Sequence, residues 1–90
     1  MSTEAEHALP NVDFATFVLS LGSNVLMHLG EMPDPDSGKP AKNLALARQT
    51  IDILAMLQEK TKGNLVDGEA QLLGSLLYDL RVKYVDAQKR

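Results

Sequence analysis

The 90-residue sequence contains no cysteine, so neither a disulfide nor a thiolate metal site can hold its fold together. It has no tryptophan, two phenylalanines and two tyrosines, and its core must therefore be built mainly from aliphatic side chains. The formal net charge is -3 at pH 7, which argues against the clustered cationic surface that nucleic-acid binding needs. We therefore expect a small aliphatic domain that does not bind nucleic acid.

Three segments have the apolar periodicity of helices. They cover approximately residues 14–29, 44–62 and 68–87. The residues placed to cap their N-termini are Asp13, Asn43 and Asp67. Residues 31–42 contain three prolines and a glycine, and we expect a loop there with neither helix nor strand. Residues 1–12 have the composition of a flexible polar tail. The sequence thus predicts an all-α fold, in which residues 13–90 form one small three-helix domain: an N-terminal helix and a helical hairpin.

The stretch FATFVLSLGSNVLMHLG, residues 14–30, contains no aspartate, glutamate, lysine or arginine. Sixteen helical residues would span about 24 Å, which is shorter than the ~30 Å hydrocarbon core of a bilayer. Flanking basic or aromatic residues, which anchor a spanning helix, are missing as well. A helix that lies in the membrane surface would carry lysine or arginine on its polar side, and this one does not. We therefore predict no membrane span.

The apolar surface of the first two helices is wider than one small domain can bury. On a helical wheel the apolar faces cover about 200°, 180° and 140° in chain order, whereas a surface helix needs about 100°. This surplus predicts that the first two helices complete the core as a homodimeric helical bundle. A groove for a different protein and a cavity for an apolar ligand are the alternatives. The residues expected in the core and interface are Phe17, Leu19, Leu21, Val25, Leu29, Ile51, Ile53, Leu54 and Leu57.

Residue groupings that support catalysis or metal binding are poorly represented. His28 and Glu31 have a metal-ligand spacing, but Gly30 should end the helix between them, and two ligands do not make a site. The serines have no nucleophile motif, and the glycines form no phosphate-binding loop. Asp34 and Asp36 have the context of turn-forming residues rather than of a calcium loop. We expect no catalytic residue, no metal site and no cofactor.

Three segments carry a resemblance to a known family. They are TIDILAMLQEKTKGNL (50–65), FATFVLSLGSNVLMHLGEMPDP (14–35) and LLYDLRVKYV (76–85). Over about residues 13–86 the chain resembles the bacterial domain-of-unknown-function family DUF1844. The resemblance implies a short cytoplasmic bacterial protein with no established activity, cofactor or catalytic residues. One departure is that Gly68 and Gly74 stand where more Glu-rich helix formers are expected, and each costs a helix up to ~1 kcal/mol.

The sequence favours a non-enzymatic function based on contacts between proteins. We expect an uncharacterised cytoplasmic protein that forms a homodimer and acts as an accessory or protein-interaction module. The alternative is a small-molecule or lipid-binding protein, or a small helical enzyme, that uses a neutral polar strip on the first helix. The residues of this strip are Thr16, Ser20, Asn24 and His28.

Overall fold

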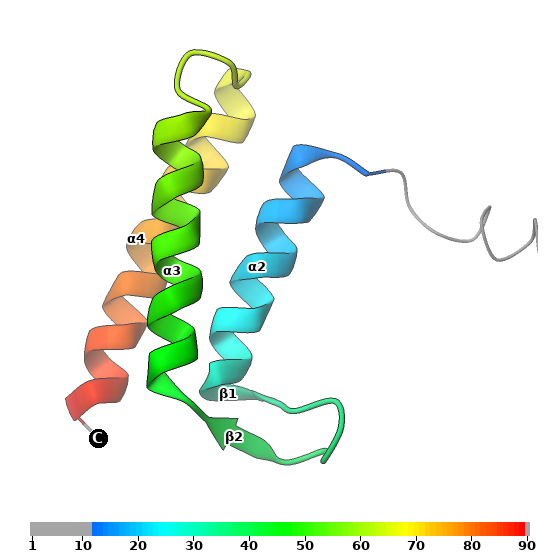
Figure 1. Ribbon diagram of the computed structural model, residues 1–90, viewed down its shortest axis with the longest axis vertical. Coiled ribbons are helices and arrows are strands. Elements are labelled where there is room, and N and C mark those ends of the chain that lie inside the picture. The colour runs from blue at the N-terminus through cyan, green and yellow to red at the C-terminus, as the bar shows by residue number, and fades with distance from the viewer. Residues whose placement is uncertain (1–11, 90) are drawn as a thin grey trace, which may run out of the picture.

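The computed structural model describes residues 12–89, which form three α-helices and one short β-hairpin (Figure 1). The elements in chain order are α2 (Phe14–His28), β1 (Leu29–Pro33), β2 (Pro40–Lys42), α3 (Leu44–Lys60) and α4 (Asp67–Lys89). The prediction of a mainly helical three-helix domain is confirmed, and each helix begins and ends within two residues of the expected position. The tail predicted for residues 1–12 lies outside the described residues except for Val12.

Side-chain caps fix where the helices begin. The Asp13 carboxylate accepts a hydrogen bond from the Thr16 backbone N–H at 2.7 Å, and the Asn43 side chain accepts one from the Leu46 N–H at 3.1 Å. The expected cap at Asp67 is wrong, because Asp67 is already the first residue of α4. Glu69 instead accepts a hydrogen bond from the Val66 backbone N–H at 3.0 Å, which is one half of a capping box.

The Asp13 cap makes the stability of α2 depend on pH. The hydrogen bond from the Thr16 backbone N–H holds the pKa of Asp13 below its ordinary value. The charged cap therefore stabilises the fold above the ordinary pKa of aspartate, and this contribution is lost as the pH falls through the lower folded-state pKa. We expect Asp13→Ala to lower the melting temperature at pH 7, and this difference should shrink toward pH ~3. Thermal unfolding followed by circular dichroism measures the melting temperatures of the wild-type chain and the variant at each pH. Asp13→Asn keeps the acceptor and should retain most of the stability at pH 7, so an equal loss in both variants would contradict the capping role.

A two-stranded antiparallel sheet occupies the segment for which a loop was predicted, so that prediction is wrong. Leu29 pairs with Lys42 and Pro33 with Pro40, with an irregularity between these pairs. The prolines do not prevent pairing because Pro33 ends β1 and Pro40 begins β2, where a missing N–H is tolerated. Asp34 closes the turn: its backbone carbonyl accepts from the Gly38 N–H at 2.7 Å, and its carboxylate accepts from the Asp36 N–H at 2.8 Å.

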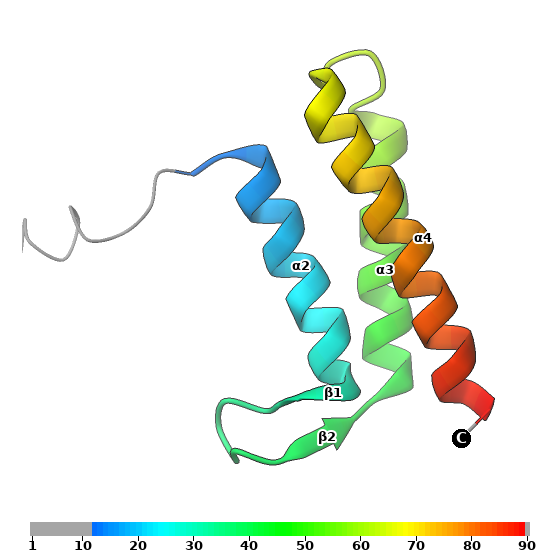
Figure 2. The same ribbon diagram turned by 180° about the vertical axis from the view of Figure 1, so that it is seen from behind.

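The core is aliphatic, as the composition indicates, and all three helices contribute to it. The buried hydrophobic residues are Val18, Val25, Leu29, Ala47, Ile51, Leu54, Leu73, Leu77, Leu80 and Ala87. Gly22 allows α2 to approach α4 closely, since a methyl group in its place would lie 3.0 Å from Leu76 Cδ2. Figure 2 shows α4 running along the side of α3, with the β-hairpin at the end of α2.

Two lysine contacts hold the β-hairpin to the end of α4. Lys42 Nζ donates a hydrogen bond to the carbonyl of Ala87 at 3.1 Å, where the last carbonyls of a helix have no partner within it. Lys83 Nζ lies 3.3 Å from Glu31 Oε1. The second pair is largely exposed, so it contributes little to the free energy of folding.

The glycine in the middle of α4 is not required by the packing of this chain. A methyl group at Gly74 would lie 3.8 Å from the nearest atom, which belongs to Gln58, whereas Gly63 has a φ of +85° that favours glycine. We expect Gly74→Ala to increase the free energy of unfolding by up to ~1 kcal/mol and Gly63→Ala to decrease it by about 1 kcal/mol. Urea unfolding followed by circular dichroism measures both. A loss of stability in Gly74→Ala would contradict this assignment.

Candidate functional site

Large apolar side chains remain exposed on one side of α2 and α3. We call this surface the α2–α3 face. It consists of Phe14, Phe17, Leu21, Leu46, Ile53 and Leu57. Phe17, Leu46 and Ile53 are 46%, 42% and 38% exposed, and the other three are half-buried. All six side chains are large and apolar, and each is at least partly accessible to solvent.

Contacts with α4 show that both halves of this face point the same way. On α2, Gly22 faces Leu76 of α4, and Phe17 lies about 140° around the helix from Gly22. On α3, Gln58 is the nearest neighbour of Gly74 of α4, and Ile53 lies about 140° from Gln58. Both groups thus lie on the side turned away from α4. This is the side that faces the viewer in Figure 1, where α4 lies behind α3.

The structure divides the residues predicted for the core and interface into three groups. Val25, Leu29, Ile51 and Leu54 are buried in the core of the single chain. Leu21 and Leu57 are half-buried, and Phe17, Leu19 and Ile53 are exposed. Leu19 lies about 160° around α2 from Phe17 and is outside the α2–α3 face. The predicted set therefore contains both a core and a surface, and its role in dimerisation remains a prediction.

The neutral polar strip lies along the outside of α2. Thr16, Ser20 and Asn24 are exposed, and His28 is half-buried at the end of the helix. The Ser20 hydroxyl donates to the Thr16 carbonyl at 2.9 Å, so it is engaged by its own helix. None of the four lines the cavity at the end of α3 or the groove on α4 that are described below. Its use as a ligand-binding surface remains a prediction.

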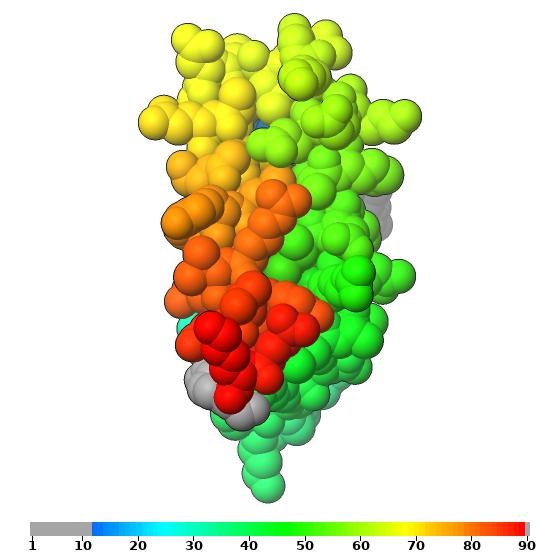
Figure 3. All heavy atoms as spheres, turned by 90° about the vertical axis from the view of Figure 1, so that its left-hand side faces the viewer, coloured from blue at the N-terminus to red at the C-terminus, as the bar shows by residue number. Residues whose placement is uncertain are grey.

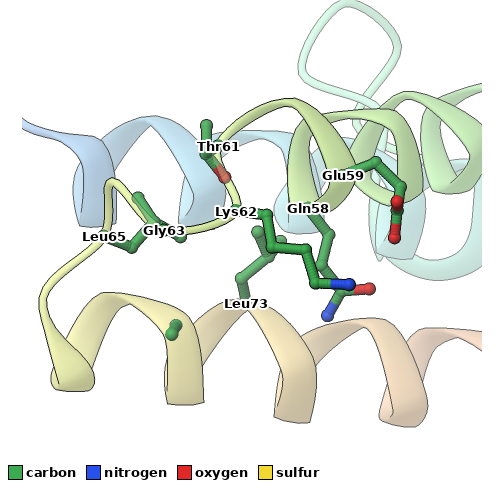
Figure 4. Close-up of a pocket in the computed structure, with 8 residues that line it drawn as sticks. Gln58, Glu59, Thr61, Lys62, Gly63, Leu65 and Leu73 are labelled. Carbon is green, nitrogen blue, oxygen red and sulfur yellow. The ribbon is translucent and has the colours of Figure 1, made fainter.

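A cavity of about 330 Å³ lies between the end of α3 and the start of α4 (Figure 4). Its lining residues are Gln58, Glu59, Thr61, Lys62, Gly63, Leu65, Ala70 and Leu73. Figure 4 shows the amine of Lys62 and the amide of Gln58 close together near the buried Leu73, with the Glu59 carboxylate pointing away. These lining residues offer one cation, one carboxylate, one amide and an apolar floor, and the Thr61 hydroxyl is engaged by the Leu57 carbonyl rather than by a base.

A second exposed apolar surface, the α4 stripe, consists of Tyr78, Val82 and Val85. It borders a shallow groove of about 500 Å³ that is also lined by charged side chains. Figure 3 shows the side of the molecule on which α4 lies beside α3. The stripe was not predicted from the sequence because the leucines of this helix already form a complete apolar stripe. The available signal was the spacing of four and then three residues between its members.

Two features were looked for within residues 12–89: a group of metal ligands and a membrane-spanning helix. No group of three potential ligands among histidine, aspartate and glutamate is close enough to hold a metal ion there. His28 ends α2, while Glu31 lies in β1 and pairs with Lys83. None of the helices in this range is both long and apolar enough to cross a bilayer.

Comparison with known proteins gives one match. The sequence profile described as "Domain of unknown function (DUF1844)" matches residues 11–86, which include α2, α3, the β-hairpin and most of α4. The chain belongs to the DUF1844 family. Searches of curated proteins and of solved structures found no match to this DUF1844 chain. Functional inference therefore depends on the surfaces of the molecule itself.

Proposed function

We propose that this DUF1844 protein is a non-enzymatic protein-interaction module, and that it forms a homodimer through the α2–α3 face. The supporting observation is the exposure of Phe17, Leu46 and Ile53 on one side of a chain that already has a buried core. Exposed apolar patches larger than a few hundred Å² are rare on soluble monomers and often mark interaction sites. The accessory role and the cytoplasmic location belong to the same proposal, and the family resemblance supports the latter.

The chemistry of the face favours a second copy of the chain as its partner. Residues 14–27 of α2 carry no charged side chain, so this half of the face has no charge that would select an oppositely charged protein. Apolar surfaces can pair with themselves around a two-fold axis, the commonest symmetry of soluble oligomers. Homodimer interfaces are also more apolar than the contacts of transient complexes.

The face extends over only part of each helix. Its residues cover positions 14–21 of α2 and 46–57 of α3, about 11 and 17 Å along the helix axes, and two helices side by side present a surface ~20 Å wide. Covering such a surface on both copies buries less than the ~1,000 Å² that a specific interface should exceed, so we expect polar residues around the face to contribute to the dimer contact. Multi-angle light scattering tests the proposal: the expected mass is twice the 9.8 kDa of one chain. A single-chain mass throughout the micromolar range would contradict it.

The cavity between α3 and α4 supports a second candidate function, the binding of a small molecule. A cavity of this volume is at the lower end of the range for ligand sites. Lys62 and Gln58 above Leu73 suit a small organic anion with an apolar body. Native mass spectrometry after gentle purification should then reveal a discrete added mass, and its absence would leave the dimerisation proposal as the sole candidate.

A further inference from the structure

The α4 stripe has the residue spacing of a two-stranded coiled coil. Tyr78 and Val82 are four residues apart, and Val82 and Val85 are three apart, which are the steps between core positions of a heptad. The three side chains are 69%, 52% and 47% exposed. They lie about 140–160° around α4 from the buried Leu80, so the chain's own core does not cover them.

The charges beside the stripe have a complementary arrangement. Arg81 directly precedes Val82, and Asp86 directly follows Val85. If Val82 and Val85 are the first and fourth positions of a heptad, Asp86 is the fifth position of that heptad and Arg81 is the seventh position of the heptad before it. Both positions border the seam, the line along which the two helices meet. In a parallel pair of helices, the seventh position of one helix faces the fifth position of the next heptad in the other. Arg81 of one copy then faces Asp86 of the partner subunit, and the same contact forms a second time by symmetry.

We infer that α4 associates in parallel with α4 of a second copy through the α4 stripe. An antiparallel pair would bring Arg81 toward the same residue of the other copy, and Asp86 likewise, so the charges select the parallel orientation. The stripe spans fewer than two heptads, so the contact is weak and forms at high protein concentration.

This contact uses a different surface from the α2–α3 face. The α4 stripe lies on α4, and the α2–α3 face lies on the side of α2 and α3 turned away from α4. Both surfaces can therefore be occupied at once, and dimers formed through one can be linked through the other into larger assemblies.

Charge reversal in the full chain tests the parallel pairing. Sedimentation equilibrium from ~10 µM to ~1 mM should show that Arg81→Glu and Asp86→Arg each weaken the concentration-dependent association about 3- to 10-fold. The first variant has two acidic residues beside the seam and the second has two basic ones. The double variant, and an equimolar mixture of the two single variants, should regain the association of the wild-type chain.

The pattern of these results separates the proposal from its competitors. Single variants that associate like the wild-type chain would overturn it, because an antiparallel pair keeps like charges together in every case. Failure of the double variant to recover would overturn it as well, provided that its melting temperature matches that of the wild-type chain. Arg48→Glu, on an exposed part of α3, is the control for a general effect of net charge and should not change the association. A dimer that persists in Arg81→Glu at low concentration would show that the α2–α3 contact is intact. The two interfaces are therefore tested separately.

Discussion

Replacing Ile53 with glutamate should convert the proposed dimer into a monomer. Ile53 is 38% exposed in the single chain, so a charged side chain there can reach water without disturbing the core. In a dimer built on the α2–α3 face, the same charge would be buried twice, once in each copy, without a partner. We expect the dissociation constant to rise by at least ~1,000-fold, which is about 4 kcal/mol. Light scattering at ~10–100 µM protein would show the mass falling to that of one chain.

A matched variant on the same helix controls for the added charge. Gln58→Glu introduces one negative charge with almost no change in side-chain shape, on the flank of α3 that faces α4. It should keep both the dimer mass and the helical circular-dichroism spectrum of the wild-type chain. If Ile53→Glu remains folded and keeps the dimer mass, the α2–α3 face is not the interface.

Replacing Leu54 with alanine should remove a large part of the folding free energy. Leu54 is completely buried and belongs to the central cluster in which the three helices meet. Truncating a buried leucine costs about 2–5 kcal/mol, because apolar contacts are lost and a cavity remains. A domain of this length has a total stability of about 4–13 kcal/mol. Urea unfolding should therefore show a much lower midpoint, or a chain that is partly unfolded without denaturant.

The same truncation at an exposed leucine provides the comparison. Leu19 is 50% exposed on α2 and lies outside the α2–α3 face. Leu19→Ala should cost less than ~1 kcal/mol, since surface substitutions have small effects and alanine has a high helix propensity. Similar losses in the two variants would mean that Leu54 is not at the centre of the core.

The helices could be predicted from the sequence because local chemistry specifies them. Asp13 and Asn43 cap their helices with side-chain hydrogen bonds, as their positions before apolar segments indicate. The β-hairpin was missed because the prolines of residues 31–42 were interpreted as evidence against strands. Pro33 and Pro40 instead lie at strand ends, and the pairing depends on the turn between them.

The division of apolar residues between core and surface could not be predicted in the same way. Val25 is buried and Leu19 is exposed on the same helix, because neighbouring helices cover only part of its circumference. The position of a neighbour is a tertiary property that a helical wheel does not contain. The α3–α4 cavity has the same origin, since it depends on how the turn after Lys60 separates the two helices. The α4 stripe could have been predicted from its heptad spacing, but the leucines of that helix already accounted for an apolar face.

The central claim is that a second copy of the chain covers the α2–α3 face. Isotope-filtered NMR on an equimolar mixture of labelled and unlabelled protein detects contacts between copies alone. We expect intermolecular nuclear Overhauser effects from the Phe17 ring and from the methyl groups of Leu46 and Ile53, which lie on the exposed part of the face. Intermolecular contacts that come from other surfaces while these three residues show none would contradict the claim.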